Sequence, residues 1–337
     1  MSASVGFGAA AIAVGWKIID NHAAPGTVLR SGPSPLGQRL YRGVDLAFGT
    51  SISVQLLHDD EKQANLAIED AFAAAKKIDF LMSVYRHSSQ VFTLNAIGSL
   101  DHPDPHLVAV LKIARDLTAL TQGAFDVTVQ PLWIAYKNAH SRGDLPTDAE
   151  RESARTLVDS RQLVFDERSV QLLRPGMAIT LNGIAQGYAT DLALAAIRAR
   201  GIRHALLDMG ECGAVGARDE DRPWMLGIQD PRKSELLARA LRMDSRSAAT
   251  SGDYETGFNA DFSQHHIFDP HTGSSPPELA SATVVAPTAV LADGLSTAMM
   301  VMGAARAIKL ASTLENVDVM LIGKAGERWE SPDFPWS

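Results

Sequence analysis

Three residues that open the apolar segment "LADGLSTAMMVMG" have the types and spacing of a partial cation site. Asp293, Ser296 and Thr297 are separated by three and four positions, which places their oxygens on one face of a helix. A carboxylate and a hydroxyl on one helical turn are suitable ligands for a hard cation such as magnesium. The same spacing also fits an aspartate that caps its own helix, so both interpretations stay open.

A second unusual stretch is "ITLNGIAQGYATD", in which small residues follow one another closely. A strand-like run at 178–180 stops at Asn182-Gly183, and a helix is expected from Gly187. Small residues let the backbone approach another group closely, and free N–H groups at a helix start attract anions. A tight turn packed against a neighbouring segment is the alternative.

Further polar clusters occur in otherwise apolar surroundings. Tyr85 ends a long helical segment, Asp126 follows a glycine and an aromatic residue, and His265 precedes His266 in "HHIFDPHTG". Because histidine titrates near neutral pH, one of this pair is a candidate general base. A histidine pair in a loop also fits a surface feature or a hydrogen-bonded one.

The elements that must position these clusters are mixed helices and strands. Apolar spacing of three and four predicts a helix ending near 82, and others are expected at 106–120, 187–200 and 295–314. Strands are expected as a pair over 42–56, as a hairpin turning at 166–168, and at 204–210, 239–249, 281–286 and 317–323. There is no regular strand–helix–strand period. We therefore expect an α+β fold, a single globule of mixed, largely antiparallel sheets flanked by helices.

Composition limits the partners and the compartment. The 337 residues carry a net charge of −8 and one cysteine, Cys212, so nucleic acid is a poor partner and a disulfide or multi-cysteine zinc site is excluded. The common nucleotide-binding and hydrolase motifs are absent. The apolar stretch 4–16 is too short to span a bilayer and resembles the core of an export signal without its basic start. We expect a periplasmic protein that does not span the membrane, with a leader and lead-in at 1–40 and one domain at 41–330.

Seven polar or glycine-containing motifs follow one another along the chain. They are "FLMSVYRHSSQVFTLN", "GAFDVTVQPLW", "LNGIAQGYATD", "DMGECGAVG", "ATSGDYE", "HIFDPHTG" and "LADGLSTAMMVMG". In this order they resemble the ApbE family, whose members are FAD:protein FMN transferases. The resemblance runs from about residue 49 to residue 323, and the sequence "TLNGIAQGYATD" is most similar to the NosX-type members associated with maturation of nitrous oxide reductase.

This resemblance implies a reaction and roles for individual residues. FAD is the substrate, Mg²⁺ bridges its pyrophosphate, and FMN is transferred to a threonine or serine of a partner protein with release of AMP. Asp293 and Thr297 match magnesium ligands, with Ser296 beside them and a carbonyl from Gly183. His266 matches a histidine near the transfer site and is the candidate base. The positions that match flavin contacts are Tyr85, Ala124, Phe125, Asp126 and Ile267. The implied acceptor is a NosR-like membrane flavoprotein.

The chain departs from the family pattern at three places. Phe48 replaces a methionine before Gly-Thr, Thr180 and Gln186 replace an aspartate and a lysine, and "NxGG" becomes "DMGE" at 208–211. Thr180 and Gln186 flank the small-residue turn, so we expect both at the wall of the cofactor site. The substitutions leave two rival functions open, a non-catalytic FAD-binding carrier and an FAD pyrophosphatase.

Overall fold

The centre of the molecule is a nine-stranded sheet in which every paired neighbour is antiparallel. The structure is a computed structural model that describes residues 16–17, 27–33, 38–219 and 222–336. In sheet order the strands are β15 (Arg328–Glu330), β14 (Asp318–Gly323), β13 (Leu279–Ala286), β12 (Ser247–Gly252), β9 (Cys212–Val215), β8 (His204–Asp208), β4 (Thr50–His58), β3 (Arg39–Ala47) and β2 (Thr27–Pro33).

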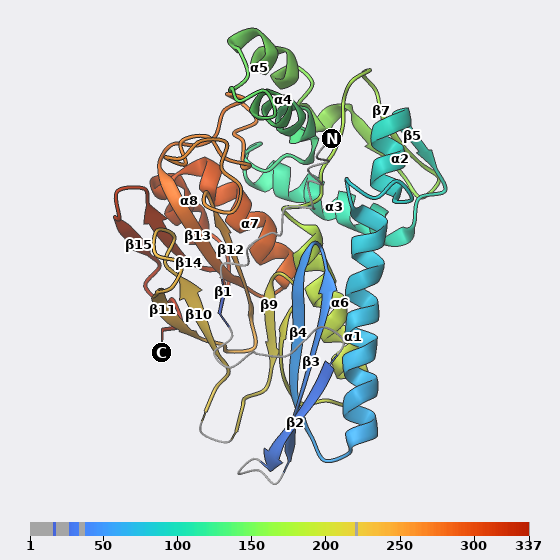
Figure 1. The fold of residues 1–337 in the computed structure, drawn as a ribbon, viewed down its shortest axis with the longest axis vertical. Helices are drawn as coiled ribbons and strands as arrows, with labels where there is room; N and C mark the ends of the chain where they lie inside the picture. The colour runs from blue at the N-terminus through green and yellow to red at the C-terminus, as the bar shows by residue number, and fades with distance from the viewer. Residues whose placement is uncertain (1–15, 18–26, 34–37, 220–221, 337) are drawn as a thin grey trace, which may run out of the picture.

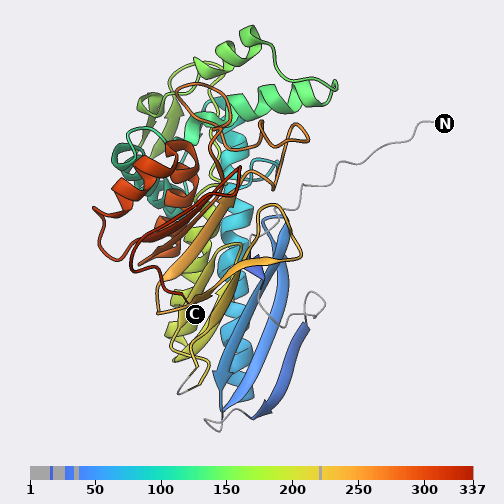
Figure 2. The ribbon, with the colours of Figure 1, turned by 90° about the vertical axis from the view of Figure 1, so that its left-hand side faces the viewer.

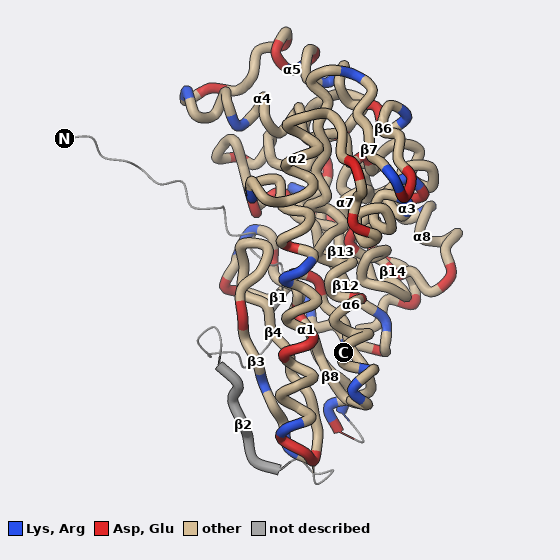
Figure 3. Tube along the Cα trace, turned by 90° about the vertical axis from the view of Figure 1, so that its right-hand side faces the viewer, with Lys and Arg blue, Asp and Glu red and all other residues tan. Residues whose placement is uncertain are grey.

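Helices cover one face of this sheet (Figure 1). The long α1 (Glu61–Met82) packs beside α6 (Ala185–Ala199), and α6 packs beside α7 (Ala289–Met302), which is followed by α8 (Ala304–Ala311). Asp60 caps α1 by accepting a hydrogen bond from the Gln63 backbone N–H. Basic and acidic side chains are interspersed along α1 (Figure 3), while its apolar stripe faces the core.

A small sheet lies on the opposite face of the large one (Figure 2) and consists of β1 (Trp16–Lys17), β10 (Met225–Gln229) and β11 (Leu237–Arg242). The large sheet is therefore buried on both faces. Adjacent residues face opposite cores: Leu207 and Val284 pack under the helices, whereas Leu206 and Val285 pack under the small sheet. This explains why β13 is buried along its whole length and β8 at its three central residues, rather than at alternate positions only.

The remaining elements gather at one end of the molecule, at the top of Figure 1. They are α2 (Gln90–Ile97), α3 (Pro105–Leu120), α4 (Gln130–His140), α5 (Asp148–Arg155), the 3₁₀ turns Val127–Val129 and Ser160–Gln162, and a third sheet of β5 (Ser99–Asp101), β7 (Ser169–Leu172) and β6 (Leu163–Phe165). None of the helices in the described parts of the chain is both long enough and apolar enough to cross a bilayer.

The α+β expectation is confirmed, and most predicted elements are present with shifted ends. Three predictions were wrong. The helix expected at 295–314 is two helices, because Gly303 adopts φ +74° between α7 and α8. The strand expected at 239–249 is divided between β11 and β12. The strand-like run 178–180 is not paired with a strand. Instead, the Asn95 side chain accepts from the Ile179 N–H at 2.7 Å and donates to the Ile179 carbonyl at 2.8 Å.

Candidate functional site

One cavity of about 570 Å³ collects nearly all of the predicted site residues. It lies where the β3–β4 turn, the end of α1, the Ala124–Trp133 segment, the starts of α6 and α7, and the loop after β12 meet. Its volume is within the range of small-molecule sites. The predicted residues in its wall are Tyr85, Ala124, Phe125, Asp126, Thr180, Gly183, Gln186, His266, Ile267, Asp293 and Thr297. Ser296 does not line it.

The N-terminal turns of α6 and α7 cap each other. Asp293 on α7 accepts a hydrogen bond from the Gly187 N–H at 2.9 Å. Asp191 on α6 accepts from the N–H groups of Ala289 and Val290 at 2.8 and 3.0 Å. A Cβ on Gly187 would lie 2.4 Å from the Ala289 carbonyl oxygen, so only glycine permits this approach. The two carboxylates thus lock the helix starts together against the cavity.

Asp293 does not cap its own helix, which excludes one of the two interpretations of its spacing. Thr288 is the N-cap of α7, and Asp293 is the fifth residue of that helix. Asp293 is 3% exposed, and burial raises the pKa of its carboxyl to about 7. A buried carboxylate with one hydrogen-bond donor is poorly compensated, which favours a cation beside it.

Gly183 and Thr297 lie against each other at the same place. A Cβ on Gly183 would be 2.9 Å from the Thr297 hydroxyl oxygen. That hydroxyl lies 3.2 Å from the Ser251 hydroxyl, which in turn bonds Ser296 at 2.8 Å. Ser296 also donates to the Asp293 carbonyl at 2.8 Å, so it supports the site from behind the cavity wall.

These positions fit a magnesium ion. Among the described residues, no three His, Cys, Asp or Glu side chains converge as a metal-binding group. The predicted ligand set does not require such a group, because it contains one carboxylate, the Thr297 hydroxyl and the Gly183 carbonyl. Magnesium is commonly held by one or two carboxylates, with substrate phosphates and water completing six ligands. Asp293, Thr297 and Gly183 are therefore the residues that would hold the ion.

Two further buried carboxyls, Glu211 and Glu255, line the same cavity. Burial first, and then the neighbouring Asp293, raise the pKa of Glu255 to about 8. Burial first, and then Asp293 and Glu255, raise the pKa of Glu211 well above its ordinary value. One Glu211 carboxyl oxygen is buried with no hydrogen-bond partner among the described residues. Because burial and mutual repulsion disfavour ionisation of these carboxyls, a cation bound beside them would favour their charged forms.

The two adjacent histidines have different surroundings. His265 is fully buried. Its backbone N–H donates to the Ser275 hydroxyl at 2.8 Å, and that hydroxyl donates to the His265 backbone carbonyl at 2.7 Å. His266 lines the cavity, with 28% of its side chain exposed. Its Nε2 lies 4.0 Å from a Glu255 oxygen, and its buried Nδ1 has no hydrogen-bond partner among the described residues. His265 therefore fits the hydrogen-bonded alternative and is buried rather than on the surface, and His266 is the histidine available to a ligand.

At neutral pH, the contact between His266 and Glu255 joins two largely uncharged groups. Burial lowers the pKa of His266 to about 4 and raises that of Glu255 to about 8. The imidazole therefore has a free lone pair, and the carboxyl retains its proton. This is the protonation state that a proton-accepting histidine requires.

The predicted flavin positions form the apolar side of the cavity. Ala124, Phe125 and Ile267 are buried, whereas Tyr85 is 49% exposed and meets Trp133 edge-on at 6.0 Å. Asp126 holds its own segment, accepting from the Thr128 N–H and hydroxyl at 2.8 and 2.6 Å and from the Ser160 N–H at 3.2 Å. Its carboxylate therefore shapes the wall through the backbone.

Thr180 and Gln186 both lie in the cavity wall, as expected. The Thr180 hydroxyl accepts from the Asn182 N–H at 3.3 Å. The Gln186 side chain is buried against Gly210, and its Nε2 has no hydrogen-bond partner among the described residues. A Cβ on Gly210 would lie within 2 Å of that nitrogen, so glycine is required beside it.

Sequence reasoning missed several residues of the wall, chiefly Glu211, Glu255, Ser251 and Trp133. Glu255 and Ser251 lie in the "ATSGDYE" cluster, and Glu211 is itself one of the departures from the family pattern. Acidic residues in these short motifs were the available signal. Trp133 ends the motif "GAFDVTVQPLW", although the helix that carries it was not predicted.

Comparison with known proteins gives a consistent result. The ApbE family model matches residues 48–321. The FAD:protein FMN transferase of Salmonella typhimurium is 33% identical over 275 residues, covering 76% of this chain and 77% of that protein. The enzyme of the same name from Escherichia coli K12 is 30% identical over 276 residues, covering 76% and 77%.

Solved structures agree with the sequence comparison. The ApbE protein of Thermotoga maritima superposes with a TM-score of 0.78 at 28% identity, covering 87% of this chain and 97% of that one. The flavin transferase ApbE of Vibrio cholerae gives 0.75 at 25% identity, covering 88% and 98%.

Proposed function

This chain belongs to the ApbE family of FAD:protein FMN transferases, and we propose that it transfers FMN with one magnesium ion, His266 as general base and a partner protein's threonine or serine as acceptor. The transferase activity is that of its curated relatives. The magnesium ion, the roles of single residues and the partner are the proposal.

The transfer exchanges one phosphoester link for another. The acceptor oxygen forms a bond to the FMN phosphorus, the bond from that phosphorus to the bridging pyrophosphate oxygen breaks, and AMP leaves with that oxygen. His266 accepts the hydroxyl proton, since its imidazole is unprotonated at neutral pH. Asp293, Thr297 and Gly183 would hold the ion, which, when bound, supplies charge neutralisation at the pyrophosphate.

The observation that carries this proposal is the meeting of Asp293, Thr297 and Gly183 with His266 in one cavity. These residues come from α7, the turn before α6 and the loop after β12. A protein that only carries FAD needs neither a buried, poorly compensated aspartate nor an unprotonated histidine beside the substrate.

The experiment supplies FAD, magnesium and an acceptor with a single candidate threonine, and examines the acceptor by mass spectrometry. We expect a gain of one FMN less one water on that threonine, and no gain when it is valine. Flavin retained without a covalent adduct would identify the carrier, and AMP released without an adduct would identify the pyrophosphatase.

The cellular setting is also a proposal. The NosX-like motif "TLNGIAQGYATD" and the apolar stretch at 4–16 support a periplasmic enzyme. Residues 4–15 of that stretch lie outside the described part of the chain. Its acceptor would be a NosR-like membrane flavoprotein in nitrous oxide reductase maturation. Co-expression with that acceptor, with and without this chain, tests the pairing by the covalent flavin on the acceptor.

A further inference from the structure

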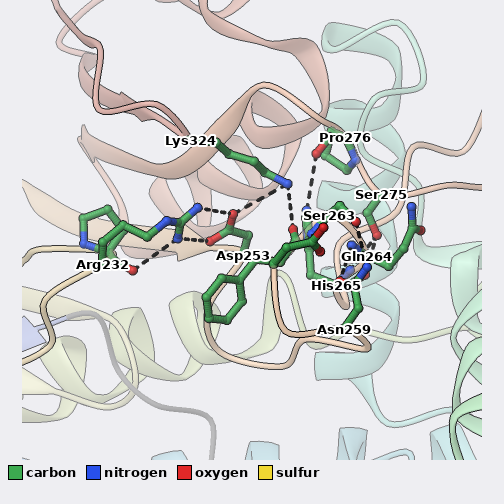
Figure 4. A network of polar contacts seen from close by, with 12 residues as sticks. Arg232, Asp253, Asn259, Ser263, Gln264, His265, Ser275, Pro276 and Lys324 are labelled. Atoms are coloured by element: carbon green, nitrogen blue, oxygen red, sulfur yellow. Dashed lines mark hydrogen bonds and ion pairs between the residues drawn. The ribbon is translucent and has the colours of Figure 1, made fainter. Parts of the chain in front are cut away.

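A buried ion-pair network lies beside the cavity, outside the set of residues described above (Figure 4). Its centre is Asp253, which is fully buried directly after β12. Both of its oxygens are bound by Arg232, at 2.7 and 2.8 Å, and Lys324 lies 3.7 Å from one of them. Paired hydrogen bonds of this kind fix direction as well as distance.

The two basic residues also hold the far part of the loop that follows Asp253. The Lys324 ammonium donates to the Phe262 carbonyl at 2.7 Å. The Arg232 guanidinium lies 5.1 Å from the centre of the Phe262 ring. Arg232 comes from the β10–β11 connection and Lys324 follows β14, so two separate strand ends hold one loop.

That loop carries the reactive side of the cavity. Residues 253–278 contain no helix or strand, yet they supply both Glu255 and His266. The His266 N–H donates to the Thr256 carbonyl at 3.0 Å, which fixes the two arms of the loop relative to each other. The position of the His266 ring is therefore set by whatever fixes these arms.

We propose that Asp253 is a positioning residue. Together with Arg232 and Lys324 it fixes the loop 253–278 and thereby holds His266 and Glu255 at the reacting groups. This inference rests on the proposed function of His266. Asp253 does not line the cavity and acts only through the loop. Because reaction rates fall about 100-fold when groups are misplaced by about 1 Å, loosening the loop should reduce kcat more than it changes KM for FAD.

The test is a double-mutant cycle of Asp253→Asn and His266→Asn. Asp253→Asn should reduce kcat by about 10–100-fold in the native background and less than threefold when residue 266 is already asparagine, since coupled sites are not additive. Lys324→Met removes only the Phe262 contact and the weaker ion pair, so it provides a second variant that is less disruptive to folding. We expect it to reduce kcat by about 3–10-fold.

Asp318→Asn is the matched control. Asp318 is also a buried carboxylate, 7% exposed, that binds an arginine, Arg246, at 2.7 Å. It lies on β14 outside the cavity wall. This variant should lower thermal stability comparably and leave kcat unchanged.

Hydrogen exchange of the backbone amides provides the readout that needs no activity. Asp253→Asn and Lys324→Met should speed exchange within 254–266 while β13 stays protected. Unchanged exchange in the loop would overturn the inference, as would faster exchange accompanied by additive kinetic effects. If the native protein transfers no FMN, the proposed function fails, and loop exchange alone still decides whether Asp253 is the anchor.

Discussion

Replacing Gly183 by alanine tests whether the cavity wall is built around a cation between α6 and α7. The added Cβ would lie 2.9 Å from the Thr297 hydroxyl oxygen, 3.3 Å from its methyl carbon and 3.5 Å from the Phe125 ring. Comfortable separations for such atoms begin near about 3.5 Å, so Thr297 must move by about half an ångström. Because the Ser251 hydroxyl lies 3.2 Å from the Thr297 hydroxyl, this movement also changes that contact.

This displacement has two measurable consequences. Overpacking of this size costs about 1–3 kcal/mol, which lowers Tm by roughly 1–4 °C in a chain of this length. If Thr297 and the Gly183 carbonyl are ligands, the magnesium concentration for half-maximal activity should rise about tenfold, which corresponds to about 1.4 kcal/mol. Circular dichroism melting and a magnesium titration of FMN transfer measure the two effects.

A glycine in the small sheet offers a matched control. A Cβ on Gly227 would lie 2.7 Å from a Leu237 methyl carbon, and neither residue lines the cavity. Gly227→Ala should lower Tm without altering the magnesium requirement. The cation-site reasoning fails if Gly183→Ala behaves like this control.

Three further outcomes follow from the same geometry. Thr297→Val should raise the magnesium concentration for half-maximal activity at least tenfold. Ser296→Ala changes a residue outside the cavity wall and should alter it less than threefold. Equal effects of the two variants in activity titrations would contradict the assignment of Thr297 as a ligand. Because the folded-state pKa of Glu255 is raised to about 8, its stability contribution is present at low pH and is lost as pH rises from about 5 to about 8. Without metal, the Tm of Glu255→Gln should therefore fall less than the Tm of the native protein over that pH range. An equal fall in the two Tm values would refute this. Asn95→Ala removes both side-chain hydrogen bonds to Ile179 and should reduce the free energy of unfolding by about 2–4 kcal/mol. Urea denaturation measures this loss. A loss below about 0.5 kcal/mol would exclude the role of Asn95 in holding the turn.

Local sequence patterns predicted the elements whose apolar residues follow one another along the chain. The apolar stripe of α1 and the largely apolar runs of β8, β13 and β14 can be recognised without knowledge of their partners. Elements whose structure depends on distant partners were not predictable in this way. The segment at Ile179 is strand-like in composition, but the side chain of Asn95, 84 positions away, provides the pairing that a neighbouring strand would normally supply.

The same distinction applies to the site. Spacing alone placed Asp293 and Thr297 on one face, because both lie within one helical turn. It could not distinguish a cap from a ligand, since the answer depends on the Gly187 N–H of another helix. Likewise, His265 and His266 are neighbours in sequence, and only the Ser275 contact assigns the first to the core.

The central claim is that this cavity cleaves FAD only to transfer its FMN half. The most direct measurement counts AMP released and FMN attached to the acceptor in the same reaction, using the native chain and Asp293→Ala. We expect one AMP for each FMN attached by the native chain, and neither product from the variant while its fold is intact. AMP in large excess over attached FMN, or full activity of Asp293→Ala, would contradict the account.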